Sequence, residues 1–278
     1  MLALVLMPIH VNSQRRNSPR RAASQKPAQK PSEKVEQPAL DNLTFTVNGV
    51  TFTMIGVQGG TFRMGANENA PDFSPTERPI HNVTLSSFYI GQTEVTQALW
   101  EAVTGESMLD EYLEEDDPFY DPRYPAYGLS WDDCQEFIEE LNRLTGQKFR
   151  LPTEAEWEFA ARGGIKSQGY FFSGSNNMDE VGWHSGCEGQ MHPVASKAPN
   201  ELGIYDMSGN VSEWCQDWYD ENYYRHSPSV NPKGPSSGRE RVMRDSSWEF
   251  PPNFAHLWRR FYCEPYEGYT GYGFRLAL

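Results

Sequence analysis

Glycine and proline recur along the whole chain, at 23 and 20 of its 278 positions. Both residues interrupt helices, glycine because its backbone is too free and proline because it lacks the amide hydrogen. Their frequency excludes a helical bundle or a coiled coil and favours short elements joined by many turns. Aromatic residues make up 13% of the sequence, so most of it is expected to form a core. The length suits one large domain or two small ones.

The first 41 residues differ from the rest in charge. They hold seven Lys or Arg and three Asp or Glu, whereas residues 42–278 hold 17 and 35. The apolar start MLALVLM predicts a signal peptide over 1–13, and therefore an exported protein, although no basic residue precedes it. A simple apolar terminus is the alternative. Residues 14–41 predict a basic, flexible linker, which leaves 42–278 as the folded domain.

The overall charge and hydropathy argue against two classes of protein. The net charge of −14 argues against a general nucleic-acid-binding protein, because the acidic body repels polyanions. No apolar run approaches the roughly 20 residues that a helix needs to span a membrane.

Local signals place several strands and helices. Asn48-Gly49 lies between two β-forming runs, 43–47 and 50–55, and predicts a tight hairpin. Residues 61–65 and 82–85 predict further strands. Three helices are predicted, each after a Ser or Thr that can cap it: residues 94–103 after Thr93, 131–144 after Ser130 and 154–162 after Thr153. After Gly164 we expect turns and short strands, so the pattern is α+β.

Seven short motifs together resemble the formylglycine-generating enzyme family, also called the sulfatase-modifying factor family. Their order and spacing match over essentially all of 50–278: Gly59-Gly60-Thr61-Phe62-Arg63-Met64-Gly65, Thr93-Glu94-Val95-Thr96, Ser130-Trp131, Leu151-Pro152-Thr153-Glu154-Ala155-Glu156-Trp157-Glu158, Gly209-Asn210-Val211-Ser212-Glu213-Trp214, Arg241-Val242-Met243-Arg244 and Gly273-Phe274-Arg275. The resemblance implies a C-type lectin-like α+β fold with few helices, short strands and much irregular structure. It also implies a binding surface in the C-terminal third.

Enzymes of this family oxidise a sulfatase cysteine to formylglycine and use two cysteines that bind copper. The corresponding positions hold Phe250 and Ala255, neither of which can ligate the metal. Cys263 lies eight residues beyond Ala255 and has no thiol neighbour in the sequence. The family's Gly-Gly pair is replaced by Asp245-Ser246, and a positive φ there would be tolerable for Asp and less so for Ser. We therefore expect no catalytic residue and no copper.

The C-terminal segment is rich in aromatic side chains. Residues 241–278 hold ten of them in 38 positions, which is twice the average of the chain. Trp248 and Phe274 sit at framework positions of the family and are expected in the core. Rigid aromatics among polar neighbours are typical of ligand-binding loops. The predicted ligand-binding residues are Asp245, Ser246, Phe250, Asn253, His256, Trp258, Tyr262, Tyr266, Tyr269 and Tyr272.

The same segment resembles the variable proteins of diversity-generating retroelements, which share this lectin fold. In those proteins a frame similar to Arg244…Ser247-Trp248 and Gly273-Phe274-Arg275 encloses hypervariable residues. The resemblance implies a diversified surface within 245–272. Residues 262–269 have neither a strand nor a helix period, and their Gly and Pro predict a loop.

A structural calcium site is the one metal site that we predict. Asp206 and Glu213 are two carboxylates around a glycine turn, and oxygen ligands suit Ca²⁺. The resemblance implies side-chain ligands from Asp206 and Glu213 and carbonyl ligands from Gly209 and Val211. A polar turn held by hydrogen bonds is the alternative.

The four cysteines fall into two pairs by context. Cys134 lies in a predicted helix and Cys215 follows the calcium motif, and both are expected to be buried. Cys187 and Cys263 lie in predicted loops, where they could pair or stay free, because export would permit disulfides.

These observations favour an exported, monomeric bacterial protein without enzymatic activity that binds a protein or glycan through 245–272. Two alternatives stay open, because a fold does not determine a function. A copper-dependent formylglycine-generating oxidase would convert a sulfatase-type peptide. A structural subunit of an envelope machine would co-purify with envelope partners.

Overall fold

The computed structural model describes residues 40–108, 119–187 and 189–278, so the predicted signal peptide and nearly all of the predicted linker lie outside it. Its elements are short, as the glycine and proline content predicts. The strands are β1 (Leu43–Val47), β2 (Val50–Val57), β3 (Gly60–Met64), β4 (His81–Leu85), β5 (Phe88–Gly91), β6 (Ser212–Trp218), β7 (Arg241–Arg244), β8 (Phe261–Cys263) and β9 (Tyr272–Gly273). The helices are α1 (Gln97–Thr104), α2 (Trp131–Thr145), α3 (Glu154–Ala161) and α4 (Met178–Val181), with 3-10 turns η1 (Pro75–Glu77), η2 (Gly164–Lys166), η3 (Tyr223–Arg225) and η4 (Pro252–Phe254). No helix in these ranges is long and apolar enough to cross a membrane.

The strands form three small sheets, in the orders β1-β2-β5, β3-β4 and β8-β7-β6-β9. The predicted hairpin is confirmed: β1 pairs with β2 from Val47 opposite Val50 outwards. Asn48 and Gly49 have φ angles of 47° and 87°, which the mirror-image hairpin turn requires at both positions. Only the contact between β6 and β9 is parallel among these named strands.

Two of the three predicted helix starts are confirmed. Ser130 and Thr153 cap α2 and α3, and each forms a reciprocal capping box with an acidic residue three positions on. The predicted start of α1 after Thr93 is wrong, because Thr96 has the extended backbone of the cap and accepts from the Leu99 amide. Glu94 instead turns into the interior, where its carboxylate accepts from Asn210.

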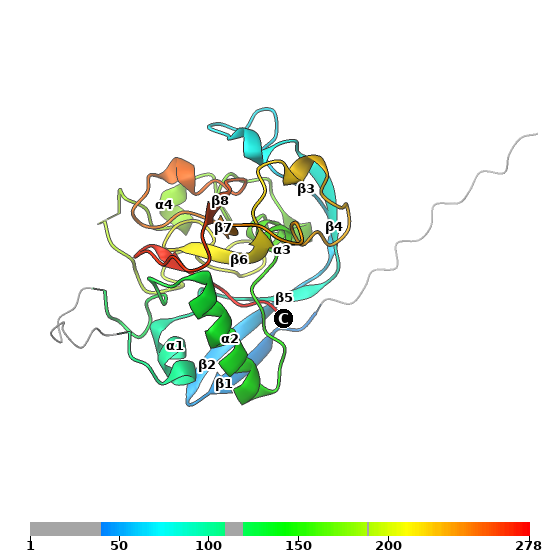
Figure 1. Cartoon of the computed structure of the whole chain (residues 1–278). Helices are drawn as coiled ribbons and strands as arrows, with labels where there is room; N and C mark the ends of the chain where they lie inside the picture. The colour runs from blue at the N-terminus through cyan, green and yellow to red at the C-terminus, as the bar shows by residue number, and fades with distance from the viewer. Residues whose placement is uncertain (1–39, 109–118, 188) are drawn as a thin grey trace, which may run out of the picture. The chain divides into compact units, whose positions relative to one another are not determined.

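The core has two main parts. In the first, helices α1 and α2 pack against the β1–β2 hairpin (Figure 1), and buried side chains such as Trp100, Phe137 and Leu141 fill the space between them. In the second, α3 contributes Trp157 and Phe159 to a cluster that it shares with β3, β4, β6 and β7. The second part supports the C-terminal segment.

Helix α3 also carries buried charges. Glu154 and Glu158 have side chains that are 2% and 0% exposed, and Arg244 donates to both, at 3.0 and 2.8 Å. Arg260 donates to the two oxygens of Glu154 at 2.6 and 2.9 Å. Burial opposes ionisation of Glu154, but Arg260 and Arg244 hold its pKa below the usual range. The sequence between Arg244 and Arg260 is therefore fixed to α3 at both ends.

A second buried ion pair fixes the C-terminus. The guanidinium of Arg275 donates from Nε and Nη2 to the two oxygens of Glu213, both at 2.6 Å. Trp157 Nε1 donates to the same carboxylate at 2.7 Å. The pair joins the end of the chain to β6, and neither side chain has measurable exposure.

Removal of Arg275 is expected to destabilise the protein strongly. In Arg275→Met the Glu213 carboxylate stays buried without its counter-ion, so we expect a loss of about 3–5 kcal/mol. Chemical unfolding in urea measures this loss. The matched control is Arg143→Met, which removes the exposed Arg143–Glu140 pair of α2 and should leave stability nearly unchanged. Similar losses in both variants would contradict the role assigned to the buried pair.

The buried carboxyl group of Asp217 is expected to make the stability of the protein depend on pH. It is fully buried and accepts from the Glu154 amide at the start of α3, and burial together with the Glu154 charge raises its pKa to about 8. In the unfolded chain the pKa is about 3.9. The native state keeps a proton that the unfolded state loses, so stability should fall between about pH 4 and 8, by about 1.4 kcal/mol per pH unit from this group.

Asp217→Asn removes this titration. The stability difference between the variant and the parent should therefore grow in favour of the variant as the pH rises from 5 to 8. Urea unfolding at each pH measures both proteins, and parallel curves would contradict the prediction.

Candidate binding surface

The C-terminal segment begins with β7. It then passes through η4 and returns as β8, which pairs with β7 (Figure 1). Val242 pairs with Tyr262 and Met243 with Phe261. The predicted loop over 262–269 is therefore wrong at its first two residues, which belong to a strand. A strand of three residues is too short to show a period, and only its partner β7 defines it.

Four of the predicted ligand-binding residues are exposed aromatics, and we call them the aromatic surface. Tyr266, Tyr269, Tyr262 and Phe250 are 67%, 53%, 49% and 42% exposed. Neighbouring rings support three of them: Phe250 lies 5.5 Å from Phe254, Tyr269 lies 5.2 Å from Tyr272, and Tyr262 stacks on Tyr219 at 4.2 Å, measured between ring centroids.

Asp245 and Ser246 are buried, which differs from the expected surface position. Asp245 has a φ of 65°, so the turn does have the positive φ that the replaced glycine suggested. Its carboxylate turns inward and accepts from the amides of Gly209 and Ser246 at 2.7–2.9 Å. Burial raises its pKa well above the usual range. These two residues shape the loop from inside.

His256 and Trp258 are also buried rather than exposed. Their rings stack at 4.6 Å, and the His256 ring also stacks on Phe172 at 5.1 Å. Burial lowers the pKa of His256 to about 4, so the imidazole is neutral at physiological pH. Sequence alone could not separate these rings from the exposed ones, because the loop that contains them has no period.

Asn253 and Tyr272 are half-buried. The carbonyl of Asn253 accepts from Arg259, and Tyr272 packs edge-on against Trp214. Of the two predicted core rings, Phe274 is fully buried as expected, whereas Trp248 is half-buried beside Phe119.

The positions of the family's two cysteines differ in environment. Phe250 is exposed, whereas Ala255 is buried in a small apolar cluster with residues of α4. All four cysteines are free, and Cys134 and Cys215 are buried as predicted. Cys263 lies in β8 rather than in a loop. Its pKa is raised to about 11 by burial and by Glu267, so it is a thiol rather than a thiolate at neutral pH.

Sequence reasoning missed one cluster of metal-ligating groups. Ligand atoms of Asp179, His184 and Cys187 lie within 4.8 Å of one another, in a loop whose Ser185 amide donates to the Phe250 carbonyl. In the sequence, the spacing Asp-x4-His-x2-Cys could have indicated this cluster. The neighbours disfavour a cation, because Lys197 Nζ lies 3.9 Å from the thiol sulfur and the Gly186 amide donates to His184 Nδ1.

The predicted calcium residues are buried, with Asp206, Gly209 and Val211 in the turn before β6 and Glu213 in β6 itself. Asp206 has one oxygen that accepts from the Ala195 amide, while Oδ1 is buried without a donor among the described residues. Burial raises the pKa of Asp206 to about 6. An orphaned carboxylate oxygen fits a cation ligand, but the Glu213 carboxylate is already engaged by Arg275 and Trp157. Of the two carboxylates, Asp206 is thus the one that fits.

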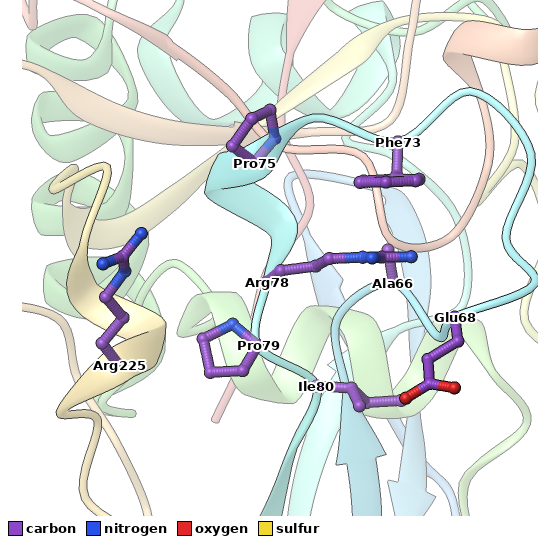
Figure 2. A pocket seen from close by; sticks show the side chains of 8 residues that line it. All are labelled: Ala66, Glu68, Phe73, Pro75, Arg78, Pro79, Ile80 and Arg225. Carbon is purple, nitrogen blue, oxygen red and sulfur yellow. The ribbon is translucent and has the colours of Figure 1, made fainter.

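Two hollows flank η1. The first has a volume of about 610 Å³ and is mostly apolar. Arg78 lies against the Phe73 ring in it, with 3.4 Å between guanidinium carbon and ring centroid, and Arg225 approaches from η3 (Figure 2). The second has about 420 Å³ and is lined by Ser74, Thr76, Tyr219, Asp220, Glu221, Glu240, Arg260 and Tyr262. Its residues come from distant parts of the sequence, so no local pattern in the sequence indicates this hollow.

Comparison with known proteins identifies a family and several similar proteins. Residues 44–278 match the model of the sulfatase-modifying factor enzyme 1-like domain. The chaperone protein LppX of Paenibacillus barcinonensis is 32% identical over 259 residues, which cover 75% of this chain and 82% of that protein. The formylglycine-generating enzyme of Streptomyces coelicolor is 28% identical over 262 residues, which cover 74% of this chain and 81% of the enzyme.

Among solved structures, the chain is similar to Treponema denticola variable protein 1. The TM-score is 0.73 with 29% sequence identity, over 85% of this chain and 98% of that one. The short strands, few helices and structural likeness confirm the predicted fold class. The motifs, the fold and the match over 44–278 together show that this chain belongs to the sulfatase-modifying factor enzyme 1-like family.

Proposed function

We propose that this protein binds a protein or glycan ligand through the aromatic surface and carries out no oxidation of its own. The observation that carries the proposal is the exposure of Tyr262, Tyr266, Tyr269 and Phe250 on a segment that is otherwise tightly held. Large aromatic side chains give much contact area at little entropic cost, which is why they dominate binding surfaces.

The scaffold supports this function because the exposed residues lie between positions that are anchored to the core. Arg244 and Arg260 hold the segment to α3 by buried ion pairs, and Arg275, just after β9, holds it to β6. Between these points Tyr266 and Tyr269 face solvent. A loop held at both ends loses little freedom when it binds, so its contacts translate into affinity.

The absence of thiols at positions 250 and 255 argues against the oxidase alternative. An exposed phenyl ring and a buried methyl group offer no ligand for Cu(I). The likeness to Treponema denticola variable protein 1 supports a further part of the proposal, namely that the aromatic surface is diversified. The apolar start of the sequence supports export.

Natural sequence variation tests the proposal. We expect deep sequencing of the 3′ end of this gene across its population to find variation at the exposed codons 250, 262, 266 and 269. The buried Trp258 and the frame Gly273-Phe274-Arg275 should be fixed, because changes there disturb the core.

An invariant segment would contradict diversification and leave a fixed receptor or an oxidase. The two are separated by incubating the purified protein with copper and a sulfatase-type cysteine peptide. Formation of the aldehyde would overturn the non-catalytic proposal.

We also propose that the turn at Asp206 binds Ca²⁺, supported by its orphaned buried oxygen. Gly209, Val211 and water would supply further oxygens. Calcium added to EDTA-treated protein should raise the melting temperature by about 5–10 °C at 100 times Kd. Asp206→Ala should abolish the shift, whereas Glu139→Ala on the exposed face of α2 should keep it. No shift, or the same shift in both variants, would contradict the site.

A further inference from the structure

The second hollow beside η1 has features of a ligand pocket, and we call it the tyrosine–carboxylate pocket. Its walls come from Ser74 and Thr76, from Tyr219, Asp220 and Glu221 after β6, from Glu240 before β7, and from Arg260 and Tyr262. Its volume of about 420 Å³ is in the range of small-molecule sites. The Tyr219 amide donates to the Glu240 carbonyl at 2.7 Å, which holds two of the walls together.

One wall is a pair of stacked tyrosines. Tyr219 and Tyr262 have ring centroids 4.2 Å apart and planes inclined by 26°. Tyr219 is half-buried, whereas Tyr262 is half exposed and belongs to the aromatic surface. The pair places an electron-rich rim at the edge of the proposed binding surface.

The charge of the pocket is negative. Asp220, Glu221 and Glu240 contribute three carboxylates, and Glu221 is exposed. The one arginine of the lining, Arg260, is turned inward and bound by both oxygens of Glu154. Its charge is therefore already matched within the core. The carboxylates alone would not define a site, but here they surround a cavity that has an aromatic wall.

One tyrosine of the pocket already lies beside a cationic group of the chain itself. The Arg260 guanidinium carbon lies 5.0 Å from the centroid of the Tyr219 ring. A cation above a tyrosine face is attracted by the ring and gains more when carboxylates stand beside it. Residues 42–278 carry 17 basic and 35 acidic residues, so the surrounding field also draws cations in.

We propose that the tyrosine–carboxylate pocket binds an organic cation, the guanidinium or ammonium group of an arginine or lysine side chain presented by a peptide. The inference deepens the proposed ligand-binding function and rests on it, because Tyr262 belongs to both the pocket and the aromatic surface. The cation lies against the Tyr219–Tyr262 pair and pairs with Glu221 and Glu240. The ligand of the aromatic surface therefore carries a basic residue next to the part that the tyrosines contact.

The test uses the full chain labelled with 3-fluorotyrosine and observed by ¹⁹F NMR. The signals of Tyr219 and Tyr262 are assigned from Tyr219→Phe and Tyr262→Phe. The probe is acetyl-Gly-Arg-Gly-amide, and the same peptide with citrulline is its neutral match. We expect the arginine peptide to shift both signals in a saturable, salt-sensitive manner, and the citrulline peptide to bind at least tenfold more weakly.

Two variants make the test specific. Glu221→Gln with Glu240→Gln should weaken binding of the arginine peptide at least tenfold, whereas Glu139→Gln on α2 should not change it. Thermal unfolding checks that both are folded. Equal binding of the two peptides, no response at Tyr219, or an equal loss in the α2 control would overturn the proposal.

A third variant separates this inference from the proposed function. Tyr266→Ala with Tyr269→Ala changes the aromatic surface outside the pocket and should leave binding of the arginine peptide unchanged. If the arginine peptide fails to bind while the codons for these two tyrosines vary in nature, the pocket is wrong and the proposed function stands. If the peptide binds and the codons are invariant, the pocket stands and diversification fails.

Discussion

Buried ion pairs between glutamates of the scaffold and arginines of the C-terminal segment hold this structure together. Glu154 and Glu158 meet Arg244 and Arg260, while Glu213 meets Arg275. A chain with such short strands has few ladder hydrogen bonds to define where its loops go. Bidentate guanidinium–carboxylate pairs supply that definition, because each one fixes direction as well as distance. Such a pair stabilises the fold little more than apolar residues of the same size would. A conformation that leaves one partner buried and unpaired is costly, however, so the pairs strongly disfavour other paths of the loops.

This constraint explains how a loop-rich segment can display aromatic rings without collapsing. Between Arg244 and Arg275, rings such as Trp258 and Phe274 point inward and are buried, while Tyr266 and Tyr269 point outward. The inward set fills the core, and the arginines hold the ends. The outward rings of Tyr266 and Tyr269 contribute little to the core. Under the proposed function, substitution at these positions would change the bound ligand and have little effect on folding.

Local features of the sequence predicted the local structure well. The Asn48-Gly49 hairpin and the boxes at Ser130 and Thr153 depend on a few consecutive residues, so their signals are complete in the sequence. The start of α1 was misplaced because Glu94 bonds to Asn210, more than a hundred residues away. The same reason hid the burial of His256, which depends on a stack with Phe172. The tyrosine–carboxylate pocket draws on four separate stretches and has no sequence pattern of its own.

The residues that stand in place of the family's catalytic motif make defined contacts of their own. Where the family pattern has a glycine, Asp245 adopts a positive φ and uses its carboxylate to accept from Gly209 and Ser246. At the two cysteine positions, Phe250 faces solvent beside Phe254, and Ala255 packs under α4. Each of these three side chains therefore has contacts that suit its position in the loop. Under the proposed function, a scaffold without reactive sulfur at these positions can vary its exposed residues, and selection for binding would act on the aromatic rings and on the acidic pocket beside them.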